Sequence, residues 1–322
     1  MNYVGIDISK KNFHAALLIG KKVKKKTCDN TQPGIEAFIA WLFEHAGEAV
    51  HACMEATGTY WEALARMLAS AGHVVSVENP KLIHNFAKSL NLRSKTDAVD
   101  ALLIARYAET RQPAAWQIPS AAQYELRQFL RRREELVKMQ TQEMNRLKSG
   151  CLHPDEQCSI EKFLRYIASE IADFERQIRC HMRGHADLAE QAKLLQSLPG
   201  VGEITSWTLL ARLRPIDAYA SAKQVAAFVG VTPKERSSGT SVKGRAPMCK
   251  MGDSEVRRLL YLAARWARTT DPGARAFSER LTKAGKPKML ILGALMRKLI
   301  HAAYGVLKHR TPYESSLAFG LV

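Results

Sequence analysis

Several signatures of common protein classes are missing from this 322-residue chain. It contains neither a G-x-G-x-x-G turn nor a Walker loop, which argues against a doubly wound nucleotide-binding fold. We find no apolar run of about 20 residues suited to spanning a membrane, and no secretory signal before the first apolar segment. The six cysteines include no C-x-x-C pair, so we expect reduced thiols in a cytoplasmic protein.

Negative charge is also scarce. The chain has 48 Lys and Arg against 31 Asp and Glu, which gives a net charge of 48 − 31 = +17. This excess favours a polyanionic partner, and together the clusters of cations indicate binding to nucleic-acid phosphates. A basic protein at a membrane surface is the competing interpretation, although no apolar span supports it. The clusters are Lys21, Lys22 and Lys24–Lys26; Arg131–Arg133; and Lys243, Arg245 and Lys250.

Four acidic residues lie where a nuclease of the ribonuclease-H type would place metal ligands. Asp7 interrupts the apolar run Tyr3–Ile8, and Glu55 ends a second apolar run. Asp97 and Asp100 open a helical stretch and, three residues apart, share one helix face. Carboxylates packed together repel one another unless cations hold them, and such hard oxygen ligands suit Mg²⁺. The pattern predicts metal-dependent phosphodiester chemistry, although each acid taken alone could simply cap a helix.

Residues 1 to about 110 alternate between strand-like and helical patterns. Apolar runs at 4–8 and 13–19, with residues 22–27 following the turn at Gly20, predict an antiparallel three-strand meander. A helix from about Pro33, the strand that ends at Glu55 and further helices and strands follow. This order is the ribonuclease-H topology, so we predict a mixed-sheet α/β domain over residues 1–120.

The remainder of the chain is predicted to be mostly helical. Apolar residues at steps of three and four predict two long helices over residues 121–185. They would form a helical hairpin or an intermolecular coiled-coil scaffold, or else bury their stripes inside one compact domain. In the last domain, residues 186–322, Gly200 and Gly202 lie between apolar helices and resemble a helix-hairpin-helix, a binder of DNA phosphates. A loop rich in serine, glycine and cations follows at 231–244, and by composition alone such a loop is usually a linker. Two further helices, from Ser254 and from Lys288, close the domain.

Five of these segments together resemble the transposases of the insertion-sequence one-ten (IS110) family, relatives of the Piv DNA invertase that are also known as DEDD transposases or bridge-RNA-guided recombinases. They occur in order over nearly the full length, and as a set they are highly specific. The stretch 244–250 after the serine loop departs from the serine-rich form of relatives. The matching segments are Tyr3–Asp7, Glu55–Tyr60, Lys95–Asp100, Leu198–Gly202 and Ser238–Gly244.

The resemblance implies a RuvC-like domain, a coiled coil and a transposase domain that holds a serine. By position it makes Asp7, Glu55, Asp97 and Asp100 the metal-binding acids, and Ser238 the nucleophile that links covalently to DNA. It also implies a structured guide RNA that pairs with double-stranded donor and target DNA, so that base pairing reads the sequence. Ser237 and Ser241 lie so close to Ser238 that the loop is better defined than the nucleophile.

The acids and the serine loop lie about 140 positions apart and in different predicted domains. They therefore meet either within one chain or only in a homo-oligomer, a dimer or tetramer. Two other functions use the same residues differently. A RuvC-like junction endonuclease would use the acids with water as the nucleophile, and a non-catalytic nucleic-acid binding protein would keep the acids as remnants.

Overall fold

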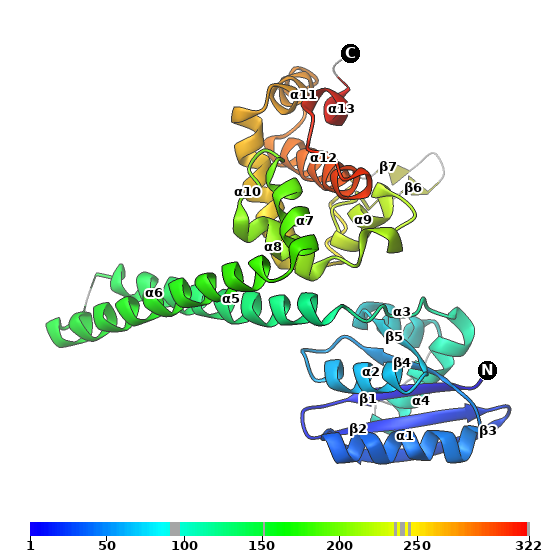
Figure 1. The fold of residues 1–322 in the computed structure, drawn as a ribbon. Helices are drawn as coiled ribbons and strands as arrows, with labels where there is room; N and C mark the ends of the chain where they lie inside the picture. Colours follow the sequence, from blue (N-terminus) through cyan, green and yellow to red (C-terminus); the bar gives the residue numbers. More distant parts are fainter. Residues whose placement is uncertain (91–96, 151, 235–236, 239–241, 244–245, 321–322) are drawn as a thin grey trace. The chain divides into compact units, whose positions relative to one another are not determined.

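The computed structural model describes residues 1–90, 97–150, 152–234, 237–238, 242–243 and 246–320. For residues 97–98, 237–238 and 242–243 it describes the backbone alone. The chain divides into two compact units, Met1–Ile118 and Pro119–Val322 (Figure 1). Each unit has its own buried apolar core.

Unit 1 is built on a five-stranded mixed sheet with the strand order β3-β2-β1-β4-β5. Strands β1 (Tyr3–Ile8), β2 (Asn12–Ile19) and β3 (Lys22–Asp29) form an antiparallel meander. Strands β4 (His51–Glu55) and β5 (Val74–Glu78) extend the sheet parallel to β1. The predicted meander and the mixed ribonuclease-H-like sheet are therefore confirmed.

Helices cover both faces of this sheet. Helices α1 (Gln32–Ala46) and α2 (Trp61–Ser70) bury apolar side chains against one face, whereas α3 (Pro80–Ser89) and α4 (Asp97–Arg111) contribute to a second core on the other face. The start of α1 is set by a local contact, because the Thr31 side chain accepts a hydrogen bond from the Gly34 amide and so caps the helix.

Unit 2 begins with a helical hairpin. Its helices α5 (Ala121–Leu147) and α6 (Pro154–Arg183) pack along one another, as the apolar stripes predict (Figure 1). A capping box at Ser120 starts α5. Between the helices, Arg133 forms an ion pair with Glu175, with 2.7 Å between Nη2 and Oε1.

The rest of unit 2 is almost entirely helical. Besides the predicted helices, the part of the chain that the structure describes has α9, α11 and α13. Helix α10 ends before Pro272, and the buried Asp271 caps α11 by accepting a hydrogen bond from the Ala274 amide at 2.7 Å. The helices are α7 (Ala186–Gln196), α8 (Glu203–Arg212), α9 (Ala222–Val229), α10 (Ser254–Thr270), α11 (Pro272–Lys283), α12 (Lys288–His309) and α13 (Ser315–Phe319), with a 3-10 turn at Ile216–Ala218.

Helix α12 corrects one expectation from the sequence, that the chain has no apolar run suited to a membrane span. By length and composition alone α12 is apolar enough to cross a membrane, although Arg297 and Lys298 lie near its middle. Half of its most apolar 18-residue stretch is buried inside unit 2. Leu292, Leu295 and Leu299 pack into the core there, which accounts for the apolar composition.

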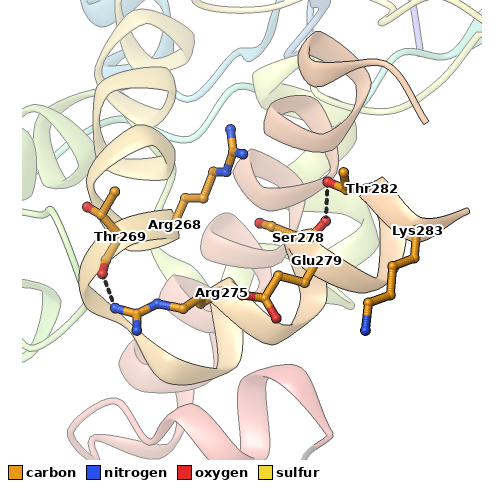
Figure 2. A pocket seen from close by; sticks show the side chains of 7 residues that line it. All are labelled: Arg268, Thr269, Arg275, Ser278, Glu279, Thr282 and Lys283. Atoms are coloured by element: carbon orange, nitrogen blue, oxygen red, sulfur yellow. Dashed lines mark hydrogen bonds between the residues drawn. The ribbon is translucent and has the colours of Figure 1, made fainter. Parts of the chain in front are cut away.

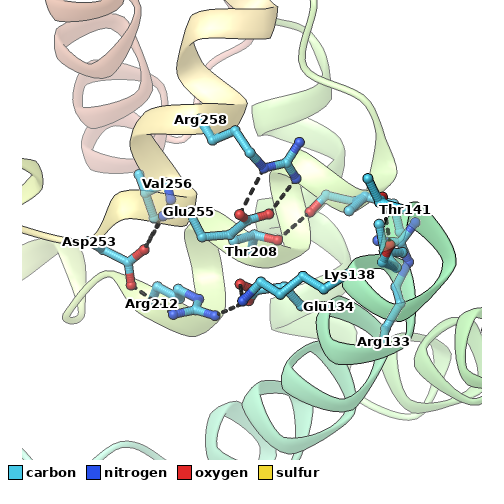
Figure 3. Close-up of polar contacts among 12 residues, drawn as sticks. Arg133, Glu134, Lys138, Thr141, Thr208, Arg212, Asp253, Glu255, Val256 and Arg258 are labelled. Carbon is cyan, nitrogen blue, oxygen red and sulfur yellow. Dashed lines mark hydrogen bonds and ion pairs between the residues drawn. The ribbon is translucent and has the colours of Figure 1, made fainter. Parts of the chain in front are cut away.

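An ionic network ties the hairpin to the rest of unit 2 (Figure 3). Arg212 of α8 lies between two acids: its Nη2 is 2.6 Å from Glu134 Oε2 of α5, and its Nη1 is 2.8 Å from Asp253 Oδ2. Asp253 also caps α10 by accepting hydrogen bonds from two backbone amides. All three side chains are mostly buried, so each charge depends on its partners to offset lost hydration. The network fixes α5, α8 and α10 together.

Candidate active site

The carboxyl ends of three parallel strands bring acidic residues together at one edge of the sheet. Ile6 of β1 is paired with Met54 of β4, so the next residues, Asp7 and Glu55, are neighbours. Glu55 is in turn paired with Glu78, the last residue of β5. Two of the four predicted acids thus lie on adjacent strands.

These acids also share one face of the sheet. Along a strand, alternate side chains point to opposite faces. Val4, Ile6 and Met54 pack into the core under α1 and α2, whereas Cys53 packs into the core with α4. Asp7 directly follows Ile6 and Glu55 directly follows Met54, so both acids point away from the α1–α2 core and lie on the face that α4 covers.

Helix α4 approaches this face unusually closely, and Gly5 is the reason. A Cβ added at Gly5 would lie 2.1 Å from the Ala105 backbone nitrogen and 2.2 Å from the Ala101 carbonyl oxygen. Only glycine therefore permits this contact between the helix backbone and β1. Asp97 and Asp100 stand in the first turn of α4, one turn before the residues packed on the sheet. The side chain of Asp97 lies outside the described residues.

Two groups beside the carboxylates have raised pKa values. Burial, reinforced by the charge of Glu78, raises the pKa of Tyr107 to about 12. The phenol hydroxyl of Tyr107, on α4, donates a long hydrogen bond to Glu78 Oε2 at 3.5 Å. Burial and the charges of Glu78 and Glu55 also raise the pKa of the Cys53 thiol. Both groups stay neutral at physiological pH and add no further negative charge.

Two neighbours of the site were missed in the sequence. Glu78 ends an apolar strand just as Glu55 does, a signal that could have identified it. His14 is paired with Asp7 across the antiparallel ladder, and its Nδ1 lies 2.9 Å from Thr27 Oγ1. Its position depends on strand register, which the sequence pattern alone did not define.

The donor set suits a hard divalent cation. Carboxylate oxygens are the ligands that Mg²⁺ prefers, and Asp7, Glu55 and Asp100 supply them. Among the side chains that the structure describes, no three acidic, histidine or cysteine groups converge closely enough to hold a metal ion. Asp97, the fourth predicted ligand, is not in that set. Asp7 and Glu55 fit the cation in chemistry and in strand position, and Asp100 fits it in chemistry.

The part of the serine loop that the structure describes contains a small two-stranded hairpin. Strands β6 (Ser237–Ser238) and β7 (Val242–Lys243) are antiparallel, with Ser238 opposite Val242. At the base of the hairpin, the Lys234 amide donates to the Pro247 carbonyl at 2.8 Å. These contacts are backbone pairings, which do not depend on side-chain composition. The predicted contact Arg245, like Ser241, lies outside the described residues, and Lys243 is described by its backbone alone.

The glycine turn joins two helices, α7 and α8, as predicted for a helix-hairpin-helix. Gly200 has φ +77°, and a Cβ there would lie 2.7 Å from the Ala263 carbonyl oxygen of α10. Gly202 precedes α8 in extended backbone, with open space where a side chain would stand. The predicted contact Lys250 is exposed and has φ +57°. The turn therefore presents a side-chain-free backbone beside α10.

Comparison with known proteins gives consistent matches along the chain. Residues 4–153 match a family described as "Transposase", the DEDD group of IS110, and residues 192–279 match the "Transposase IS116/IS110/IS902 family". The chain is 32% identical over 320 residues to the pilin gene-inverting protein of Moraxella bovis and 31% identical over 320 residues to that of Moraxella lacunata, covering 98% of each chain in both cases. It is 24% identical over 295 residues to the transposase for insertion sequence element IS1328 of Yersinia enterocolitica, covering 81% of this chain and 82% of the relative.

Proposed function

The chain belongs to the IS110 family of transposases, and from this premise we propose that it exchanges DNA strands through a covalent phosphoserine intermediate. Family membership makes it a transposase of the recombinase type with a metal-dependent DEDD domain. The serine, the identity of the ion, the guide RNA and the oligomer are parts of the proposal. The names of the Moraxella relatives support inversion between two sites of one DNA molecule as one outcome of the exchange.

Asp7, Glu55, Asp97 and Asp100 are proposed to hold Mg²⁺ at the carboxylate edge. When bound there, the ion supplies positive charge that stabilises the oxygens of the scissile phosphate. The observation that carries this step is the register that makes Asp7 and Glu55 neighbours on parallel strands, under a helix that starts with the other two acids. Histidine or cysteine ligands would favour a softer metal.

Ser238 is the proposed nucleophile. Its Oγ attacks phosphorus and loses its proton, the bond from phosphorus to one DNA oxygen breaks, and that strand end leaves as a free hydroxyl. The phosphoserine conserves the bond energy, so a hydroxyl of a new strand can displace the serine and rejoin the DNA without ATP. The β6–β7 pairing supports this role because it sets the backbone of Ser238 opposite Val242 and that of Ser237 opposite Lys243.

DNA and RNA contacts are proposed for the helical unit. Gly200 and Gly202 would expose backbone amides to phosphate, and Lys243, Arg245 and Lys250 would surround the serine hairpin with positive charge. A structured guide RNA would pair with donor and target DNA while the protein recognises shape and phosphates. The net charge of +17 is consistent with so much phosphate.

Assembly into a dimer or tetramer is also proposed, with residues 121–185 as the scaffold. The α5–α6 hairpin exposes large apolar side chains, among them Met139, Met144, Phe163 and Tyr166, that a partner helix would cover. Pairing of hairpins would allow the acids of one subunit to serve the serine of another. We place this assembly in the cytoplasm, where its free cysteines would stay reduced.

A single experiment separates this mechanism from a junction endonuclease that uses water. Ser238→Ala, Ser237→Ala and Ser241→Ala are incubated with Mg²⁺, guide transcript and donor DNA, and DNA-linked protein is measured on denaturing gels. We expect Ser238→Ala alone to abolish both the adduct and strand exchange. Cleavage by Ser238→Ala without an adduct would instead establish the water mechanism, and loss with Ser237→Ala alone would move the nucleophile by one residue.

A further inference from the structure

Helix α10 carries an exposed ridge that packing inside unit 2 does not explain. Its inner face, with Leu260, Ala263 and Ala267, belongs to the core. On the outer face Trp266 is 62% exposed and Leu262 is 45% exposed. We call Leu262, Arg265, Trp266 and Thr269 the α10 ridge; their spacing of three, one and three residues places them on one helix face.

The Trp266 ring is not needed for the packing of its own helix. The glycine turn lies against α10, and the three atoms nearest to a Cβ at Gly200 would be two of the Ala263 backbone and the Cβ of Trp266, the latter at 3.0 Å. An alanine at 266 would keep that atom. Burying a tryptophan ring in a binding partner yields a large gain for little loss of side-chain entropy, so an exposed ring on a rigid helix indicates a binding surface.

Next to the ridge lies a basic groove between α10 and α11, with a volume of about 580 Å³. Thr269 belongs to both, so the two features are continuous. The guanidinium of Arg275 donates to the Thr269 carbonyl oxygen, which holds it at the groove (Figure 2). Three cations face one acid here, giving the lining a net charge of 3 − 1 = +2. The lining residues are Arg268, Thr269, Arg275, Ser278, Glu279, Thr282 and Lys283.

From this combination we infer that the α10 ridge and the adjoining groove bind a single DNA strand. Cations along a groove neutralise the sugar-phosphate backbone, and an exposed aromatic ring stacks on an unpaired base, whereas the bases of a duplex are already stacked. Arg265 would add a phosphate contact on the ridge. The commitment to DNA rests on the proposed function, because strand exchange frees single strands while the ends are being transferred.

Binding of the full-length protein to a fluorescent 20-nucleotide mixed-sequence DNA strand tests the inference by anisotropy. We expect Trp266→Ala to weaken binding roughly tenfold and Trp266→Phe to retain most of the affinity, because a phenyl ring still stacks. Neutralising Arg268, Arg275 and Lys283 to glutamine should lower the slope of log affinity against log salt by about two, the value for three lost phosphate contacts on a single strand.

Matched controls lie away from the α10 ridge. Phe43→Ala removes an exposed aromatic ring on α1, and a triple change of Lys138, Lys162 and Arg165 on the α5–α6 hairpin to glutamine removes the same charge elsewhere in unit 2. Equal losses from the two triple variants would overturn the inference, since net charge alone would explain them. Unchanged affinity of a folded Trp266→Ala protein would also overturn the inference. Tighter binding of the same sequence as RNA, if it depends on Trp266, would overturn it as well.

The readout is independent of the proposed chemistry. Strand binding by this surface requires no Mg²⁺ and no nucleophile, so Asp7→Asn and Ser238→Ala proteins should bind the strand as wild type does. If those variants retain strand exchange while Trp266→Ala still loses binding, the proposed mechanism fails and the inferred surface stands. If Trp266→Ala binds the strand normally while wild type still forms the adduct, the surface fails and the mechanism stands.

Discussion

The carboxylate edge of unit 1 and the serine hairpin of unit 2 supply the two halves of the proposed chemistry, yet they are built in different ways. Asp7 and Glu55 stand in regular parallel strands, and a helix closes over them in backbone contact at Gly5. Ser238 stands in a strand of two residues within a segment rich in serine and glycine. The metal-binding half is therefore set by the core of a domain, whereas the nucleophile half is held by local backbone pairing.

The largest expected effect is a loss of strand cleavage, without loss of DNA binding, when an acid of the carboxylate edge is replaced. Asp7→Asn should lower strand cleavage in Mg²⁺ by at least about a hundredfold, because a carbonyl oxygen replaces a charged ligand oxygen. Binding to donor DNA should change little. A gel-based cleavage assay beside an anisotropy titration measures both, with Glu36→Gln on the exposed side of α1 as the matched acid. Equal cleavage by the Asp7 and Glu36 variants would contradict a metal site at this edge.

A smaller effect tests how rigidly the edge is built. Gly5→Ala should destabilise unit 1 by about 3 kcal/mol, since the added carbon overlaps the α4 backbone and the helix has to move. Gly305→Ala in α12 of unit 2 meets open space and should be neutral or stabilise by up to about 1 kcal/mol. Urea unfolding followed by circular dichroism compares the two. Should both alanines be tolerated alike, the close contact at Gly5 would not exist in solution.

The smallest effect concerns the neighbour of the acids on α4. Tyr107→Phe removes one long hydrogen bond to Glu78 and should cost about 1 kcal/mol at neutral pH. The pKa of Tyr107 is raised to about 12 in the fold, so its contribution is complete below pH 10 and is lost as the pH rises toward 12. Thermal melts across this range should therefore fall more steeply for wild type than for the variant. Parallel curves would show that Tyr107 ionises as it does in water.

Much of unit 1 could be predicted from its residues. Alternating apolar side chains in β1 and β2 define both strands and the face on which Asp7 lies, because only one orientation of β1 buries Val4 and Ile6. The pairing of Glu55 with Glu78 could not be predicted. It depends on how two parallel strands, joined by a helix, align with each other, and this is a long-range property.

Unit 2 was harder to predict for physical reasons. Helix α11 was missed because its apolar side is short and Asp271 serves both as the end of one helix and as the cap of the next. The β6–β7 hairpin was missed because its stability comes from backbone hydrogen bonds that leave no apolar pattern. The glycine turn was predicted because Gly200 needs a positive φ, and that need is visible in the residue itself.

The ion-paired Arg212 has a mechanical consequence. Arg212 joins α5 to α8 and to the start of α10, so the α5–α6 hairpin and these two helices should move as one rigid body. A torque applied to the hairpin by another copy would be delivered to the exposed tryptophan on α10 without being absorbed by a hinge at that joint.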